Sequence, residues 1–178
     1  MNYRLFEVVN GVSGRFDSLD DVLEFAAVWL VYGVFVVSAL LVGRELYRRR
    51  FQPVVELGSA LFLAFAGAWI LSHLSGQVRP FQSHQVHQLI PHDPGVSLPS
   101  DHATAAFALA FGVMAFISRR WGTGLAVAAV VIGFARVWVG VHYPGDILAA
   151  GLIAGLAVLE VWVGVRWNRA VTRLARQE

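Results

Sequence analysis

Five long apolar runs, separated by short polar stretches, dominate the chain. Each run approaches the roughly 20 apolar residues that a helix needs to cross the hydrocarbon core of a bilayer. The pattern predicts an all-α integral membrane protein whose five transmembrane helices form one bundle. In sequence order the runs cover residues 22–42, 54–74, 102–117, 122–141 and 147–165.

The first 21 residues have a different pattern. Apolar residues at positions 5, 8, 9 and 12 share one helical face, but Gly11 and Gly14 interrupt them before they could span a bilayer. This spacing predicts a short interfacial or re-entrant helix. No signal peptide is expected, because no basic start leads into an apolar core with a cleavage site. One domain, 1–178, is expected, made of an N-terminal segment, a bundle with one long outer loop, and a basic tail: 1–21, 22–165, 77–98 and 166–178.

Composition supports the membrane assignment. The chain is 57% hydrophobic and 15% charged, whereas soluble domains carry about 25% charged residues. Cysteine is absent, which excludes disulfides and thiolate metal sites. The net charge of +2 is too small to suggest nucleic acid as a partner. Membrane lipids are therefore the expected surroundings of this protein.

The positions of the basic residues predict an orientation. All 14 basic residues are arginine, and ten of them lie after the first run, after the third run and in the tail. With five spans these three places share one side, which the positive-inside rule assigns to the cytoplasm. The N-terminus is then outside, the C-terminus is cytoplasmic, and Arg79 and Arg136 lie near the outer surface. The ten are Arg44, Arg48, Arg49, Arg50, Arg119, Arg120, Arg166, Arg169, Arg173 and Arg176.

The segment from Arg136 to Asp146 holds the strongest candidate chemistry. Ionisable groups at membrane depth are costly and are functional candidates by default. Pro144 suits the first turn of a helix, so Asp146 would lie near the positive end of the helix dipole. Its carboxylate could hold one imidazole nitrogen of His142 and leave the other free to attack an anion held by the arginine. The alternative is a helix-end histidine that only caps carbonyl groups.

A second candidate feature begins the third apolar run. Pro99-Ser100 predicts a helix start with Ser100 as the N-cap. The free N–H groups of such a helix end bind phosphate well, and His102 would lie in the first turn beside them. Two arginines, a helix N-terminus and two histidines are thus expected at one depth. No acidic cluster suits Mg²⁺, so neither a metal nor a cofactor is expected.

These motifs resemble a known family. Arg79-Pro80, then Pro99-Ser100-Asp101-His102, then Arg136 with His142 and Asp146, are similar to the three-part signature of the type-2 phosphatidic acid phosphatase superfamily. Three further segments resemble its bacitracin-resistance type of undecaprenyl pyrophosphate phosphatase. They are residues 1–6, residues 86–92 and residues 138–144.

The resemblance implies a fold, a mechanism and roles. In the family the residue matching His142 is a nucleophile that forms a phosphohistidine, and the one matching Asp146 orients it. His102 matches the general acid that protonates the leaving oxygen. Phosphoryl transfer needs mostly positioning and charge neutralisation, which arginines can provide. The expected phosphate-binding residues are Arg79, Ser100, Asp101 and Arg136.

The resemblance also implies a substrate. The expected reaction converts undecaprenyl pyrophosphate to undecaprenyl phosphate and phosphate on the outer face of the bacterial plasma membrane, which recycles the cell-wall lipid carrier. An alternative substrate is another lipid phosphate, such as phosphatidylglycerol phosphate or phosphatidic acid. From a different class, the chain could be a haem-binding membrane protein with His73, His102 or His142 as axial ligands.

Several positions depart from the family pattern. A lysine seven residues before the first-motif arginine is replaced by Ser72, the second-motif glycine by Asp101, and the serine before Arg136 by Ala135. We expect Asp101 to point outward or to cap the helix. The family usually has six spanning helices, one more than found here. Four polar residues have no assigned role, namely the loop histidines and one carboxylate in the last run: His84, His87, His92 and Glu160.

Overall fold

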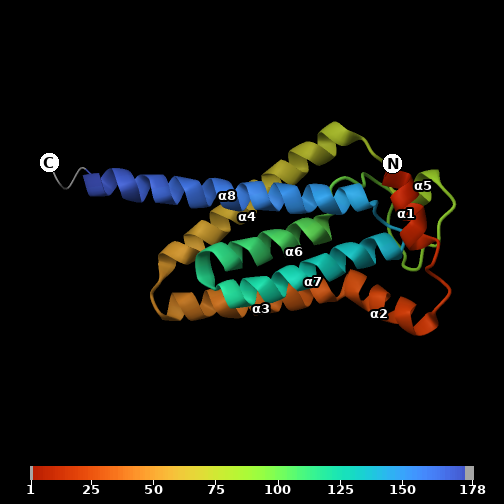
Figure 1. Cartoon of the computed structure of the whole chain (residues 1–178), viewed down its shortest axis with the longest axis horizontal. Helices are drawn as coiled ribbons and strands as arrows, with labels where there is room; N and C mark the ends of the chain where they lie inside the picture. The colour runs from red at the N-terminus through yellow and green to blue at the C-terminus, as the bar shows by residue number, and fades with distance from the viewer. Residues whose placement is uncertain (1, 175–178) are drawn as a thin grey trace.

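The computed structural model describes residues 2–174, with side chains for residues 2–169. Helices form every regular element in this part of the chain, with one isolated bridge between Val78 and Val96 (Figure 1). The predicted all-α class is confirmed. The helices are α1 (Asn2–Asn10), α2 (Asp17–Val28), α3 (Leu30–Tyr47), α4 (Phe51–Ser75), α5 (Pro80–Ser83), α6 (Asp101–Gly112), α7 (Arg119–Trp138) and α8 (Pro144–Leu174), and a π-helical turn, η1 (Val113–Ile117), extends α6.

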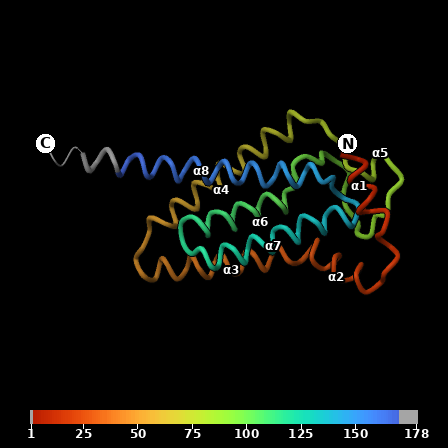
Figure 2. The backbone as a smooth tube through the Cα atoms, viewed as in Figure 1, coloured from red at the N-terminus to blue at the C-terminus, as the bar shows by residue number. Residues whose placement is uncertain are grey.

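Four of the described helices are long and apolar enough to cross a bilayer. They are α3, α4, α7 and, from Pro144 to Arg169, α8. The predicted span at 102–117 corresponds to α6 and η1, a shorter apolar helix, Asp101–Ile117. This helix lies in the middle of the bundle, between α7, α8, α4 and α3 (Figure 2). Because neighbouring helices surround it, most of its residues are buried, including Ala103, Ala106, Ala108 and Ala110.

The predicted first span, 22–42, is wrong as a single element. The chain breaks at Trp29, so α2 ends at Val28, and α3 continues to Tyr47, beyond the predicted end. Neither proline nor glycine lies at the break. The cause is tertiary, because α2 packs on the C-terminal end of α7 and the indole Nε1 of Trp138 donates to Oδ1 of Asp20 at 2.7 Å. The packed residues of α2 are Leu23, Ala26 and Ala27, against Ala135, Trp138 and Val139.

Small residues allow the helices to approach closely. A Cβ atom added at Gly133 of α7 would clash with Ile147 of α8, and one at Gly112 of α6 would clash with Leu57 of α4. Without a hydrophobic driving force between helices in lipid, such close backbone contact is a main source of association. Glycine therefore lets α7 pack closely on α8, and α6 on α4.

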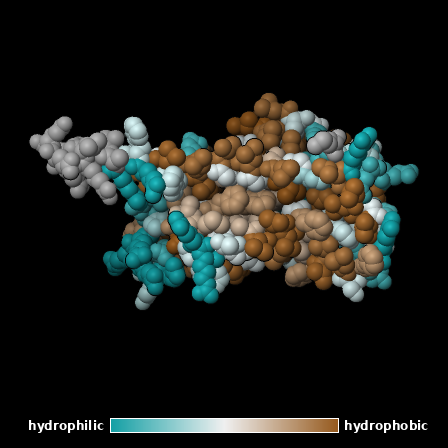
Figure 3. All heavy atoms as spheres, in the orientation of Figure 1, coloured by the Kyte–Doolittle hydropathy of each residue, from teal (hydrophilic) through white to brown (hydrophobic). Residues whose placement is uncertain are grey.

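The surface has an apolar belt between two polar ends (Figure 3). At one end, which we call the arginine-rich end, Glu45 and Glu56 are buried and paired with Arg44 at 2.8 Å and Arg169 at 3.4 Å. Glu160, which had no assigned role, is exposed on α8. The other end, the site end, carries α1, α5 and the loop between α5 and α6 (Figure 1).

The predicted N-terminal helix exists as α1 at the site end. Its buried residues are Phe6 and Asn10. Of the apolar face predicted from positions 5, 8, 9 and 12, Leu5, Val8 and Val12 are exposed, whereas Val9 is partly buried and packs on the core. Contact of this face with the membrane interface stays a prediction.

Candidate active site

A tight turn between α7 and α8 presents His142 to the interior. Gly140 has φ of +85°, which glycine adopts readily, and a Cβ atom there would lie 2.6 Å from the carbonyl oxygen of His87. The N–H groups of Val141 and His142 both donate to the carbonyl oxygen of Arg136, at 3.2 and 3.3 Å. The chain therefore reverses direction sharply at this turn. The His142 side chain points inward and is only 2% exposed.

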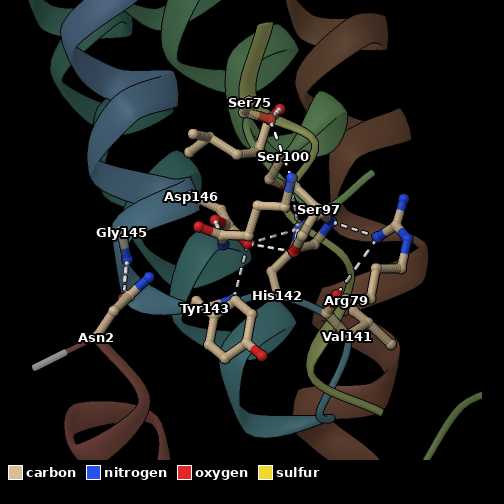
Figure 4. A network of polar contacts seen from close by, with 12 residues as sticks. Asn2, Ser75, Arg79, Ser97, Ser100, Val141, His142, Tyr143, Gly145 and Asp146 are labelled. Atoms are coloured by element: carbon tan, nitrogen blue, oxygen red, sulfur yellow. Dashed lines mark hydrogen bonds and ion pairs between the residues drawn. The ribbon is translucent and has the colours of Figure 1, made fainter. Parts of the chain in front are cut away.

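Asp146 holds one side of the His142 ring. As predicted, α8 begins at Pro144 and places Asp146 in its first turn, where the side chain is fully buried. His142 Nδ1 lies 2.9 Å from the Ser97 carbonyl oxygen and 3.3 Å from Asp146 Oδ2 (Figure 4). The carboxylate also accepts from the Tyr143 N–H at 2.8 Å, from Gln77 Nε2 at 2.9 Å and from the Ser97 hydroxyl. So many donors suit an ionised carboxylate, which only accepts.

Arg79 holds the other side of the ring and identifies the tautomer. Its Nη1 lies 3.0 Å from His142 Nε2, and because a guanidinium can only donate, Nε2 carries the lone pair. The proton is then on Nδ1, facing Asp146. Burial and the charges of Arg136 and Arg79 lower the pKa of His142 to about 4, against the opposing effect of its hydrogen bond to Asp146. At neutral pH the ring is uncharged with its free lone pair toward the arginine, which is the form a nucleophile requires.

The two arginines come from different elements. Arg79 is the N-cap residue of α5, whose first residue is Pro80, and its N–H donates to Gln82 Oε1 at 3.1 Å. Arg136 lies in the last turn of α7, and its Nη1 donates to the Ala27 carbonyl oxygen at 3.4 Å. Their exposed fractions are 8% and 2%. Two buried guanidinium groups at one site favour an anionic ligand.

Three buried polar atoms here lack a hydrogen-bond partner within the described chain. They are Nε of Arg79, Nε of Arg136 and Oγ of Ser100. Ser100 is the N-cap residue of α6, as predicted, but its side chain does not cap the helix. Buried donors are rarely left unpaired in native proteins, so these three are suited to the oxygens of a bound phosphate. The backbone N–H of Ser100, unlike its hydroxyl, has a partner: it donates to the Asp146 carbonyl oxygen at 3.4 Å. This hydrogen bond links the start of α6 to the start of α8.

The first turn of α6 completes the predicted set. His102 is partly buried and lies within electrostatic range of Arg136, His92 and Arg79. Asp101 is exposed, as the expectation that it points outward requires, and its charge acts on both arginines. The structure thus gathers all seven predicted site residues at the site end of the bundle.

Two residues of the hydrogen-bond network were not predicted. Ser97 and Gln77 contact Asp146 or His142 directly, although they lie 49 and 69 positions from Asp146 in the sequence. A polar serine between Val96 and Leu98 was the only local signal. Ser72, which replaces the family lysine, donates to the Trp69 carbonyl oxygen of its own helix at 2.9 Å and does not substitute for a cation.

The N-terminal segment holds the turn between α7 and α8 in place, which the sequence did not indicate. Asn10 is buried; its Nδ2 donates to the carbonyl oxygens of His87 and Trp138, both at 2.8 Å, and its Oδ1 accepts from the His87 N–H at 2.9 Å. Asp20 joins Trp138 to the N–H of Gly14. Burial acts to raise the pKa of Asp20, but these hydrogen bonds lower it overall. Three distant segments are thereby held in one arrangement beside His142.

Comparison with known proteins identifies the family of the chain. The family model of the PAP2 superfamily matches residues 53–170, about two thirds of the chain. The chain belongs to the PAP2 superfamily. The resemblance inferred from the three motifs is confirmed, as is the prediction of an enzyme of the phosphatase class.

Individual relatives in this superfamily cover most of the chain. Undecaprenyl-diphosphatase BcrC of Bacillus subtilis is 32% identical over 156 residues, which are 86% of this chain and 79% of that protein. The bacitracin transport permease protein BcrC of Bacillus licheniformis is 29% identical over 169 residues, 91% of this chain and 79% of that one. The crystal structure of Aquifex aeolicus LpxE has a TM-score of 0.72 at 25% identity and covers 89% of this chain and 93% of that chain.

Proposed function

We propose that this PAP2 enzyme hydrolyses undecaprenyl pyrophosphate to undecaprenyl phosphate and inorganic phosphate. The observation that carries the proposal is the state of His142, with Nδ1 held by Ser97 and Asp146 and with Nε2 facing Arg79 at 3.0 Å. A neutral imidazole between a carboxylate and a cation is prepared to attack a phosphoryl group. The lipid is inferred from the relative named undecaprenyl-diphosphatase, which is 32% identical to this chain.

The reaction divides into two displacements. The lone pair of His142 Nε2 attacks the terminal phosphorus, an N–P bond forms, and the bond to the bridging oxygen breaks. His102, in its protonated form, donates a proton to that oxygen and becomes neutral, so undecaprenyl phosphate leaves. Water, deprotonated by His102, then attacks the phosphohistidine and releases phosphate, which restores neutral His142. Asp146 stabilises the positive charge on the ring while the N–P bond forms.

Arg79, Arg136 and the first turn of α6 neutralise the negative charge of the phosphoryl group. Their unpaired Nε atoms, with the Ser100 hydroxyl, are the donors for the equatorial oxygens of the phosphoryl group. Within residues 2–174 there is no group of three or more histidine or acidic side chains arranged to hold a metal ion. We therefore expect the reaction to persist in the presence of a chelator.

The site is proposed to face outward. Ten arginines lie at the opposite end of the bundle or in the tail, which the positive-inside rule assigns to the cytoplasm. The N-terminus and loop 77–98 would then lie outside the bacterial plasma membrane and the C-terminus inside. A carrier lipid released after export of cell-wall precursors would meet the enzyme on that side.

The test is phosphate release by the purified protein in detergent with EDTA present. The substrates are undecaprenyl pyrophosphate, phosphatidylglycerol phosphate and phosphatidic acid, and His142→Ala is the inactive control. We expect the highest kcat/KM for the pyrophosphate and a ³²P label trapped on wild-type protein but not on the variant. A higher kcat/KM for either glycerolipid would instead assign the chain to that substrate.

A further inference from the structure

His92 lies beside the nucleophile but has no part in the mechanism above. Its ring centroid is 6.3 Å from that of His142, with the ring planes at 82°. The side chain is partly buried, and burial together with the charges of Arg79 and Arg136 lowers the pKa of His92, although a hydrogen bond to Asp93 acts against this. His92 in turn acts electrostatically on His102. This loop histidine therefore faces the same space as both arginines and both proposed catalytic histidines.

The loop that carries His92 is fastened on both sides. Before it, the Leu89 N–H donates to the Val139 carbonyl oxygen at 3.2 Å, and Ile90 is buried against the catalytic turn. After it, the Gly95 N–H donates to Gln82 Oε1 at 2.9 Å and the Ser97 N–H donates to the Gln77 carbonyl oxygen at 2.7 Å. With anchors three residues away on either side, His92 has a defined position over the site.

The ring of His92 also has a defined direction. Nδ1 lies 3.1 Å from the Asp93 carbonyl oxygen, to which it donates, so Nε2 is the ring nitrogen left for a ligand. The ring also lies beside Phe81, with centroids 6.5 Å apart and the ring planes tilted by 42°. The negative charge of phosphate oxygens at Nε2 would oppose the lowering of the His92 pKa and favour the protonated imidazole. That form donates through Nδ1 to the Asp93 carbonyl oxygen and through Nε2 to an anionic oxygen.

The arrangement provides more cationic and donor groups than one phosphoryl group requires. Arg79, Arg136 and Ser100 supply the buried donors for the phosphate that is transferred, which would lie about 3–3.5 Å from Nε2 of His142. A lipid diphosphate brings a second phosphate joined to the first by one oxygen, and it must lie next to this cradle. His92, whose side chain is only partly buried, is a suitable partner for it.

We propose that His92 is a specificity-determining residue that binds the second, non-transferred phosphate of a lipid diphosphate through Nε2. Its contact makes the site prefer diphosphates to monophosphates. The proposal rests on the proposed function, because it presumes that the substrate carries two phosphates. It assigns His92 to substrate binding and leaves nucleophile and general acid unchanged.

The test compares His92→Ala and His92→Gln with wild type on farnesyl pyrophosphate and farnesyl phosphate. Hydrogen bonds to charged groups contribute enough that His92→Ala should lower kcat/KM for the diphosphate roughly 10–100-fold. The monophosphate should change less than about threefold. His92→Gln, which keeps a donor, should recover part of the loss. His84→Ala is the matched control, since His84 belongs to the same loop but stacks on Tyr3, with centroids 3.8 Å apart.

Inhibition gives a second measurement that does not depend on turnover of a diphosphate. The inhibition constant of inorganic pyrophosphate should rise in His92→Ala, whereas that of inorganic phosphate should stay near the wild-type value. Equal losses on both farnesyl substrates, or an unchanged constant for pyrophosphate, would overturn the role of His92. Wild-type protein that cleaves the monophosphate but no diphosphate would overturn the proposed function as well, so the two failures are distinguishable.

Discussion

Nη1 of Arg79 lies 3.0 Å from Nε2 of His142, although 63 positions separate the two residues in the sequence. The arginine thus covers the nitrogen that we propose as the nucleophile. A phosphate that enters the site must come between the two groups, and the guanidinium then transfers its hydrogen bond from the ring to a phosphate oxygen. Binding of the anion would therefore also free Nε2 of His142 from its hydrogen bond to Arg79.

Replacement of Arg79 should therefore affect both binding and rate. Arg79→Gln removes the charge and most of the donors, and loss of one preorganised donor typically costs about 10²–10³-fold in rate. Arg79→Lys keeps the charge without the planar fork and should fall between Gln and wild type. Both kcat/KM and inhibition by vanadate are to be measured, with Arg48→Gln at the arginine-rich end as the control. Tight vanadate binding by Arg79→Gln would remove Arg79 from the phosphate cradle.

The two catalytic histidines should respond differently to the leaving group. A positioned acid is worth about 10²–10⁴-fold and matters most for a basic leaving oxygen. His102→Ala should lose far more activity on a lipid pyrophosphate than on nitrophenyl phosphate, whose leaving group needs no proton. His142→Ala should lose nearly all activity on both substrates. If His102→Ala were inactive on both while His142→Ala kept aryl phosphatase activity, the two roles would be exchanged.

Asp146 should act through the negative charge that it places beside His142. Asp146→Asn keeps a polar group of the same shape but removes the charge that stabilises the positive ring while the N–P bond forms. We expect a loss of roughly 10²–10⁴-fold in kcat, as for other histidines deprived of their orienting carboxylate. Ser97→Ala keeps the backbone carbonyl that lies 2.9 Å from Nδ1 and should cost about tenfold or less. A larger effect of Ser97→Ala than of Asp146→Asn would mean that the serine, not the aspartate, orients the ring.

The pH profile should reflect the lowered pKa of His142. The neutral ring is the reactive form, so activity is lost only as pH falls through the pKa in the folded protein, about 4. At pH 5 neutral rings should still outnumber protonated ones by about ten to one, whereas a histidine at its ordinary pKa of about 6.5 would be mostly protonated. The measurement is kcat/KM for an aryl phosphate between pH 4 and 8, corrected for the separately titrated ionisation of the substrate. Half-loss near pH 6.5 would contradict a buried, neutral nucleophile.

Orientation can be tested because the chain contains no cysteine. Gln85→Cys in the loop between α5 and α6 should react with an impermeant thiol reagent in intact cells, since that loop is proposed to lie outside. Arg48→Cys at the arginine-rich end should react only after the cells are permeabilised. Both positions are exposed. The reverse labelling pattern would place the site in the cytoplasm.

The sequence by itself determined the class of the fold and the main chemical groups. Apolar runs of membrane length depend only on local composition, so α4, α7 and α8 could be predicted near their observed positions. The pairing of His142 with Asp146 is also local, because a proline at the start of a helix fixes where the fourth residue after the histidine lies. Arg79 and Arg136 were detectable because an ionised side chain in or beside an apolar run is costly without a functional reason.

Tertiary structure decided what these groups contact. The break at Trp29 has no local cause and follows from the packing of α2 on α7. Ser97 and Gln77 reach Asp146, and Asn10 reaches Trp138, across 49 to 128 positions, and such pairs leave no periodic pattern in a single sequence. The place of His92 near the nucleophile likewise depends on anchors at both ends of its loop. A hydrogen bond needs partners at about 3 Å, and only the folded chain brings such distant residues that close.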